Sequence, residues 1–346
     1  MITRLVLAAA AAAVALGLPA DVRAYEYEQE ATTKLMTDMI VDLGGHDAVR
    51  RNSGKTVRCG DGGTRRVSIV RRGATTTYRG DYRNCRERGL TRDGLYEIVF
   101  KGDEIVSSTS KRSVNGELFD AAMEGNAAGV RKLIRARADV NYTESVDRTE
   151  GGTIDGVSPL MVATMAGSLD TVKLLVANGA WVNYLNSMAV NALWIAAHNG
   201  QPEIVRYLAG RGAYLNNSNF EDVTPLMAAA MNGHLAVVKF LVGAKADINA
   251  VHRDGDTALM FALAQNRTDI ARFLIDAGAD VAVRNRHGVT ALLIAVAEEN
   301  EEIVRALLER KADVSARTAD GKSALDVARA RGMDGIAKLL EAAGSY

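Results

Sequence analysis

The chain has 346 residues, and its 42 basic residues balance its 42 acidic residues. A chain of this length has room for two domains, and the even charge excludes a protein that attracts polyanions over its whole surface. The balance hides an uneven distribution of charge along the chain.

Residues 1–24 indicate a secretory signal peptide. Arg4 supplies the positive start, residues 5–18 form an alanine-rich apolar run, and Val22-Arg23-Ala24 places small residues at the −3 and −1 positions of a cleavage site. Cleavage after Ala20 and an uncleaved membrane helix are the alternatives, although the apolar run is short for a membrane span. The alanine-rich run is typical of a bacterial export signal. We therefore expect a mature protein without a transmembrane segment, in the periplasm or secreted.

Residues 25–113 are predicted to form a small α+β domain that matches no family by its motifs. Residues 25–43 fit an amphipathic helix, because apolar residues recur at helical spacing from Met36 to Leu43. Alternating runs between glycine-rich turns then indicate an antiparallel sheet, in which the last two runs form a hairpin. The runs are 56–59, 66–70, 75–78, 96–100 and 104–107.

The two cysteines, Cys59 and Cys85, both fall in this domain. An oxidising compartment would pair them, and the disulfide would stabilise the domain by roughly 3–4 kcal/mol through the mid-sized loop it closes. A metal site and a redox motif are the competing hypotheses. Both are disfavoured, because no histidine ligands stand close by and the C-x-x-C spacing is absent.

The same domain is strongly basic. Residues 50–112 contain sixteen Lys or Arg against seven Asp or Glu, so this stretch carries an excess of nine positive charges and the rest of the chain an equal negative excess. Such a stretch could hold an anionic envelope component, such as anionic lipid or a cell-wall polymer, or nucleic acid. The alternative is a solvated outer face of a thin sheet, and few aromatic residues stand among the basic ones to stack on bases.

From residue 114 to the end, one sequence unit recurs every 33 residues. Three sets of residues keep this spacing in register, which indicates a repeat array. They are Leu160, Leu193, Leu226, Leu259, Leu292 and Leu325, then Ala163, Ala196, Ala229, Ala262, Ala295 and Ala328, and then Leu175, Leu208, Leu241, Leu274, Leu307 and Leu340.

Each unit predicts a turn followed by two short helices. In one copy, Thr257 can cap a first helix that starts near Leu259, and Ile270 to Leu274 begin the apolar stripe of a second helix that ends at Gly278. Neither helix is long enough to be stable alone in water. Stacking of neighbouring units therefore has to supply the core.

These units resemble the ankyrin repeat. The resemblance rests on Thr224-Pro225-Leu226, Ser158-Pro159-Leu160, Gly233-His234 and Gly278-Ala279-Asp280-Val281. It implies a mostly α protein, with an ankyrin-type α-solenoid of about seven repeats, caps included, after the small antiparallel-sheet domain. It also implies a partner protein bound on the concave face of the array.

One departure from the ankyrin pattern is systematic. The histidine that usually follows Thr-Pro-Leu is absent, which should remove a polar link between neighbouring repeats and, in all copies but the last, add apolar volume. We expect Trp194 to lie in the core for this reason. The replacing residues are Met161, Trp194, Met227, Met260, Leu293 and Asp326.

The predicted array runs from an N-terminal cap repeat at 114–141, through an insert at 142–155 and internal repeats at 156–317, to a C-terminal cap repeat at 318–346. The insert is expected to be a solvated loop that lengthens one turn. Its acidic residues follow no calcium-binding loop motif.

The array shows no catalytic or metal-binding constellation. Its histidines, His198, His234, His252 and His287, fall in different repeats and slots, and no glycine-rich phosphate loop follows a strand. His234 stands at a helix-turn position common in the ankyrin family, which implies a structural role. We expect no cofactor, no metal and no enzymatic activity in the array.

The predicted partner-binding surface lies in the third and fourth repeats, where the exposed slots of the turns and first helices are apolar. The same slots of the fifth and sixth repeats are charged, and an apolar patch with a polar rim is typical of a protein-binding surface. The predicted residues are Leu185, Met188, Val190, His198, Phe220, Val223, Met231 and Asn232.

Two further features favour this region. Ala189 and Asp222 occupy the turn position that holds glycine in most repeats, and departures from a local rule tend to mark functional places. Trp181 and Tyr214 replace the usual aspartate after the second helix. They are either binding residues, since aromatic residues are enriched among interface hot spots, or core residues packed on each other.

The sequence thus predicts a non-enzymatic scaffold of the bacterial periplasm that binds a partner protein. The alternative is that the basic domain carries the function, as a polyanion-binding or envelope-binding module or as an enzyme. The array would then only present this domain.

Overall fold

A computed structural model describes residues 56–58, 64–72, 75–87, 90–101, 104–147, 153–318 and 321–344, with side chains from 113 onward except at 147 and 153. The signal peptide, the helix of 25–43 and Cys59 lie outside the described residues, so export, that helix and the disulfide stay predictions. The chain divides into two units, residues 1–181 and 182–346. Among the described residues, no helix has both the length and the hydropathy to span a bilayer.

In the described part of the first unit, five strands pair in chain order as an antiparallel meander. Phe100 pairs with Ile105, so the last two strands form the hairpin that their alternating pattern predicts. The register shifts between Tyr82 and Cys85, which marks an irregularity in the third strand. The strands are β1 (Thr56–Arg58), β2 (Thr64–Arg72), β3 (Thr75–Glu87), β4 (Leu90–Lys101) and β5 (Glu104–Arg112).

The described part of the first unit also contains two helix pairs and a hairpin. The helices are α4 (Val114–Met123), α5 (Ala127–Arg135), α6 (Pro159–Met165) and α7 (Leu169–Ala177). Ser113 follows β5 directly and caps α4, because its hydroxyl oxygen accepts a hydrogen bond from the Gly116 amide at 3.0 Å. Leu118 and Phe119 on α4 are fully buried, and α4 packs on α6.

The predicted loop between these helix pairs is a hairpin instead. Strands β6 (Glu144–Asp147) and β7 (Thr153–Val157) pair in antiparallel fashion. Ile154 is buried, and the Ser145 hydroxyl donates to Asp155 Oδ1 at 2.5 Å. The insert therefore has a small core contribution of its own, which sequence reasoning missed because the alternating run is only a few residues long.

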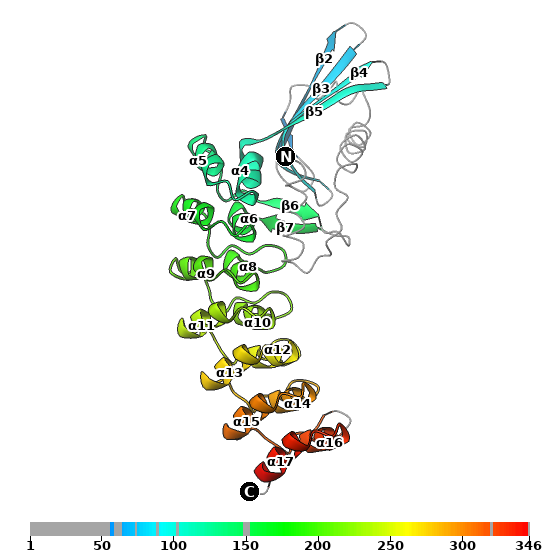
Figure 1. Ribbon diagram of the computed structural model, residues 1–346. Coiled ribbons are helices and arrows are strands. Elements are labelled where there is room, and N and C mark those ends of the chain that lie inside the picture. The colour runs from blue at the N-terminus through cyan, green and yellow to red at the C-terminus, as the bar shows by residue number, and fades with distance from the viewer. Residues whose placement is uncertain are drawn as a thin grey trace. The chain divides into compact units, whose positions relative to one another are not determined.

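The second unit consists of five helix pairs. Figure 1 shows its first helices in one column and its second helices in another. Each first helix begins after a side chain that accepts a hydrogen bond from the backbone, such as Thr224 Oγ1 from Met227 N at 3.3 Å. The pairs are α8 (Ala192–His198) with α9 (Pro202–Ala209), α10 (Pro225–Met231) with α11 (Leu235–Gly243), α12 (Ala258–Ala264) with α13 (Thr268–Asp276), α14 (Ala291–Ala297) with α15 (Glu301–Glu309), and α16 (Ala324–Ala330) with α17 (Asp334–Ala343).

The three residue ladders form the core of this unit. Leu193, Leu226 and Leu259 are at most 1% exposed, and the ladder alanines of the first helices are fully buried. A small side chain there allows successive first helices to approach closely, as α10 does with α8 and α12. Across the described residues, the fourteen helices α4–α17 confirm the mostly α, repeat-based fold.

A ladder of asparagines links successive repeats along the ends of the second helices. Each amide oxygen accepts a hydrogen bond from a backbone N–H group at 2.8–2.9 Å. The donor belongs to the next repeat in every case except that of Asn115, whose partner lies in the same N-terminal repeat. The pairs are Asn115 with Asp139 and Asn141 with Trp181 in the first unit, and Asn183 with Tyr214, Asn216 with Asp247 and Asn249 with Asp280 in the second. The ladder ends at Ala282, where an ion pair between Arg284 and Asp313 spans the same step.

Replacing Asn216 by Ala should lower the free energy of unfolding by about 1 kcal/mol, because the Asp247 amide loses its acceptor. Ala282→Asn should raise it by a similar or smaller amount, since the new amide can extend the ladder to the next repeat. Urea unfolding of both variants checks this. A neutral Asn216→Ala variant would contradict the proposed contribution of the ladder.

Candidate functional site

Turns of the second unit project beyond the first helices, and one of them precedes each of α8, α10, α12 and α14 (Figure 1). We call them fingers, and they comprise residues 185–190, 218–223, 251–256 and 284–289. Each finger is closed by a backbone hydrogen bond between its second and its last residue. These bonds run from Asn186 N to Val190 O, Asn219 N to Val223 O, His252 N to Asp256 O and Asn285 N to Val289 O, at 2.8–3.1 Å.

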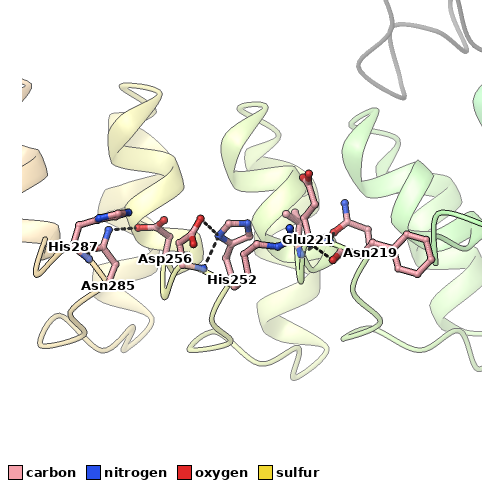
Figure 2. A network of polar contacts seen from close by, with 10 residues as sticks. Asn219, Glu221, His252, Asp256, Asn285 and His287 are labelled. Atoms are coloured by element: carbon pink, nitrogen blue, oxygen red, sulfur yellow. Dashed lines mark hydrogen bonds and ion pairs between the residues drawn. The ribbon is translucent and has the colours of Figure 1, made fainter. Parts of the chain in front are cut away.

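The side chain of the second finger residue stiffens each turn. Asn219 Oδ1 accepts hydrogen bonds from the Glu221 and Val223 amides at 3.0 and 2.9 Å, and Figure 2 shows Asn219 beside Glu221. Asn186 and Asn285 make the same pair of bonds in their own fingers. In the third finger His252 takes this role, since its Nδ1 accepts from Asp254 N at 3.2 Å. Each turn thus satisfies some of its backbone donors with one of its own side chains.

Neighbouring fingers are joined to one another. The side-chain amide of Asn217, which directly precedes the second finger, donates to Ala189 O at 2.9 Å, and the Arg253 guanidinium donates to Phe220 O. Between the third and fourth fingers, Asn285 Nδ2 donates to Asp256 Oδ1 at 2.8 Å, as Figure 2 shows. The four fingers therefore form one connected strip, which we call the finger ridge.

Every finger bends through a residue with positive φ. Glycine holds this place in the third and fourth fingers, at φ of 87° and 74° for Gly255 and Gly288. Ala189 and Asp222 hold it in the first two fingers at 58° and 62°. These two residues thus keep the left-handed turn without glycine, at a steric cost that is larger for alanine than for aspartate.

The first fingers expose apolar side chains. Leu185 is 41% and Phe220 65% exposed, and Met188 is half-buried. Val251, which sequence reasoning missed, is 53% exposed at the slot that Leu185 occupies two repeats earlier. That shared slot is the signal that could have identified it. We call these four residues the apolar end of the finger ridge.

The prediction that the partner-binding residues are exposed is wrong for two of them. Val190 and Val223 are 1% and 8% exposed, so both belong to the core. Each directly precedes the residue that caps a first helix, Asn191 or Thr224, where the chain enters the stack. A residue at this place cannot present its side chain to a partner.

Three more predicted residues lie half-buried at the C-terminal ends of the first helices. The His198 ring stacks on that of Trp194 with centroids 5.2 Å apart. The Asn232 side chain donates to Ala228 O at 3.0 Å, and the Met231 carbonyl accepts from Arg267. These residues border the ridge with side chains that are partly engaged in the fold.

The two aromatic residues after the second helices are exposed. Trp181 is 61% and Tyr214 65% exposed, so the alternative that they pack on each other in the core is wrong. Each belongs to the segment that follows a second helix, α7 or α9, and its backbone amide is part of the asparagine ladder. They lie outside the finger turns.

Sequence models of known families match more than half of the chain. The model of three ankyrin repeats matches residues 118–219 and 212–285, and the model of a single ankyrin repeat matches 287–319. The chain belongs to the ankyrin repeat family. A comparison with curated proteins found no significant match. Ankyrin repeats are typically non-enzymatic binding modules, and they indicate a protein–protein interaction module in this chain.

Trp194 stands where the ankyrin pattern has histidine. It is buried, as predicted, but it does not abolish the polar link between repeats. Its indole Nε1 donates to the Val223 carbonyl of the next finger at 2.8 Å. The prediction that the polar link is lost is therefore wrong at Trp194, because the indole ring supplies a hydrogen-bond donor as well as apolar volume.

His234, at a common ankyrin position, has a structural role in this array. Its Nε2 donates to the His198 carbonyl of the preceding repeat at 2.9 Å, and burial lowers its pKa below the ordinary value, so the ring is neutral at pH 7. A Cβ at Gly200 would lie 2.3 Å from this ring, which explains the glycine there. Among the described residues, no three His, Cys, Asp or Glu side chains are grouped to hold a metal ion.

Replacing Ala189 by Gly should raise the free energy of unfolding by about 0.5–1 kcal/mol, because glycine relieves the left-handed strain and loses part of this gain to chain entropy. Gly321→Ala is the matched control. A Cβ there meets nothing within 4 Å, so the strain alone should destabilise the protein by about 1 kcal/mol. Thermal unfolding measures both, and a destabilised Ala189→Gly variant would show that the turn is not strained.

Proposed function

We propose that this chain is a non-enzymatic scaffold that binds a partner protein on the apolar end of the finger ridge, centred on Leu185, Met188 and Phe220. The observation that carries this proposal is the exposure of Leu185 and Phe220, and the partial exposure of Met188, on turns that the fold already holds in place. Covering large apolar groups that the fold leaves in water lowers the free energy, so such groups favour the binding of a partner.

The links between fingers support the same assignment. A binding surface loses less conformational entropy on association when its loops are already ordered. Here each turn closes on its own backbone, and the hydrogen bonds of Asn217 and Arg253 tie one finger to the next. Partner recognition would therefore use a preformed surface.

The composition of the ridge changes along its length. Its first two fingers expose Leu185 and Phe220, whereas the last finger exposes Arg286 and His287. An apolar centre next to a charged rim is the usual anatomy of a protein-binding surface, in which the centre supplies affinity and the rim supplies specificity. The half-buried Met231 borders this centre.

Replacing Met188 and Phe220 together by Ala should weaken partner binding by roughly 2–4 kcal/mol, because hot-spot side chains of this kind carry most of the affinity. The partner would be isolated by affinity capture from the periplasmic fraction and titrated against both proteins. Val114→Ala is the matched control, since Val114 is an apolar side chain about as exposed as Leu185 but lies on α4, outside the fingers.

Salt dependence separates the proposal from the alternative of polyanion binding by the basic residues 50–112. Affinity for an apolar ridge should change little between low and high salt, whereas affinity that rests on Arg and Lys contacts to a polyanion falls steeply. Unchanged affinity of the double variant together with a steep salt dependence would assign binding to the basic domain.

We also propose that the protein is exported, on the strength of the signal-like residues 1–24. Expression of the full chain in a bacterial host, followed by fractionation and N-terminal sequencing, tests this. The expected product is periplasmic and begins at Tyr25. A product that keeps Met1 and stays with the membrane would favour an uncleaved helix.

A further inference from the structure

The first-helix side of the first two repeats in the second unit carries very little charge. Residues 184–200 and 217–234 comprise two fingers and the helices α8 and α10 that follow them. The only Asp, Glu, Lys or Arg residues in these two stretches are Glu221 and Asp222, both on the second finger. This side therefore consists of apolar and uncharged polar residues, except for the two adjacent acidic residues Glu221 and Asp222.

The cations of the same repeats lie with the second helices. Arg206 on α9 forms an ion pair with Glu203 at 2.6 Å, and its guanidinium lies 6.0 Å from the ring centroid of Phe240. Arg211 lies 5.0 Å from the ring centroid of Tyr207. The basic residues Arg206 and Arg211 thus lie on α9 or just after it, on the second-helix side. Glu221 and Asp222 lie on the first-helix side.

Both carboxylates are available to a partner. Glu221 and Asp222 are exposed, and among the residues that the structure describes their carboxylates form no hydrogen bond or ion pair. Figure 2 shows Glu221 on the strip between Asn219 and His252. The cation of the next finger, Arg253, donates to the Phe220 carbonyl and to neither carboxylate.

Phe220 strengthens the preference for a cation. Its ring is 65% exposed and directly precedes the two acidic residues in the chain. The face of an aromatic ring attracts ammonium and guanidinium groups, and the long stems of Lys and Arg pack on apolar surface. A basic side chain placed here would gain from the ring and from the carboxylates together.

We infer that the partner of the finger ridge presents a segment in which apolar side chains stand next to a Lys or Arg. The apolar side chains cover Leu185, Met188 and Phe220, and the basic group is received by Glu221 and Asp222. This inference rests on the proposed function and adds the chemistry of the partner, which the ankyrin fold by itself does not specify.

Selection of random linear peptides displayed on phage, with the full mature chain as bait, tests the inference. Peptides selected on the wild type should combine apolar residues with Lys or Arg. Selection on Glu221→Gln/Asp222→Asn should keep the apolar residues and lose the basic ones, and a basic wild-type peptide should bind this variant about tenfold more weakly. Asparagine tolerates the left-handed turn at position 222, so the variant should fold, and its thermal unfolding is checked first.

Glu203→Gln is the matched control, because Glu203 is an exposed carboxylate on the second-helix side that is paired with Arg206. It should leave the selected basic residues unchanged. This inference is wrong if the selected peptides lack basic residues, or if basic residues persist in selection on the Glu221→Gln/Asp222→Asn variant. Neither outcome would contradict the proposed function. Peptides whose binding ignores Met188→Ala/Phe220→Ala would overturn the proposed function.

Discussion

No helix of this array can bury its apolar face without a neighbouring repeat. The first helices of the second unit are only seven residues long, and helices of this length are unstable alone in water. Their leucines reach full burial only because α8, α10, α12 and α14 stack at 33-residue intervals with a small alanine between them. Interfaces between repeats therefore supply the core.

The same dependence on neighbours applies to the polar groups. Asn216 satisfies a backbone amide of the next repeat, Trp194 donates to the next finger, and His234 donates to the preceding repeat. Each of these bonds joins groups that are about one repeat apart in the chain. Polar links and apolar stacking thus fix the same spacing, and exposed side chains on the fingers, such as Leu185 and Phe220, are not part of the core.

The separation of core residues from exposed finger side chains explains which positions of this chain can take part in binding. Side chains such as Phe220 and Glu221 can change without loss of core packing, because the turn beneath them is held by Asn219 and by backbone hydrogen bonds. The strained turn at Ala189 lies on the same part of the ridge as the exposed Leu185 and Met188. Backbone strain of this kind is commonly kept where function requires it.

Sequence periodicity alone determined the repeat, its helix pairs and their buried leucines and alanines, because every copy repeats the same short-range pattern. It also placed Leu185, Met188 and Phe220 on the fingers. Only the tertiary structure decided that Val190 and Val223 are buried, that Trp194 keeps a polar link, and that the insert is a hairpin. Whether a side chain on a turn is covered depends on groups a whole repeat away, and local spacing does not record those contacts.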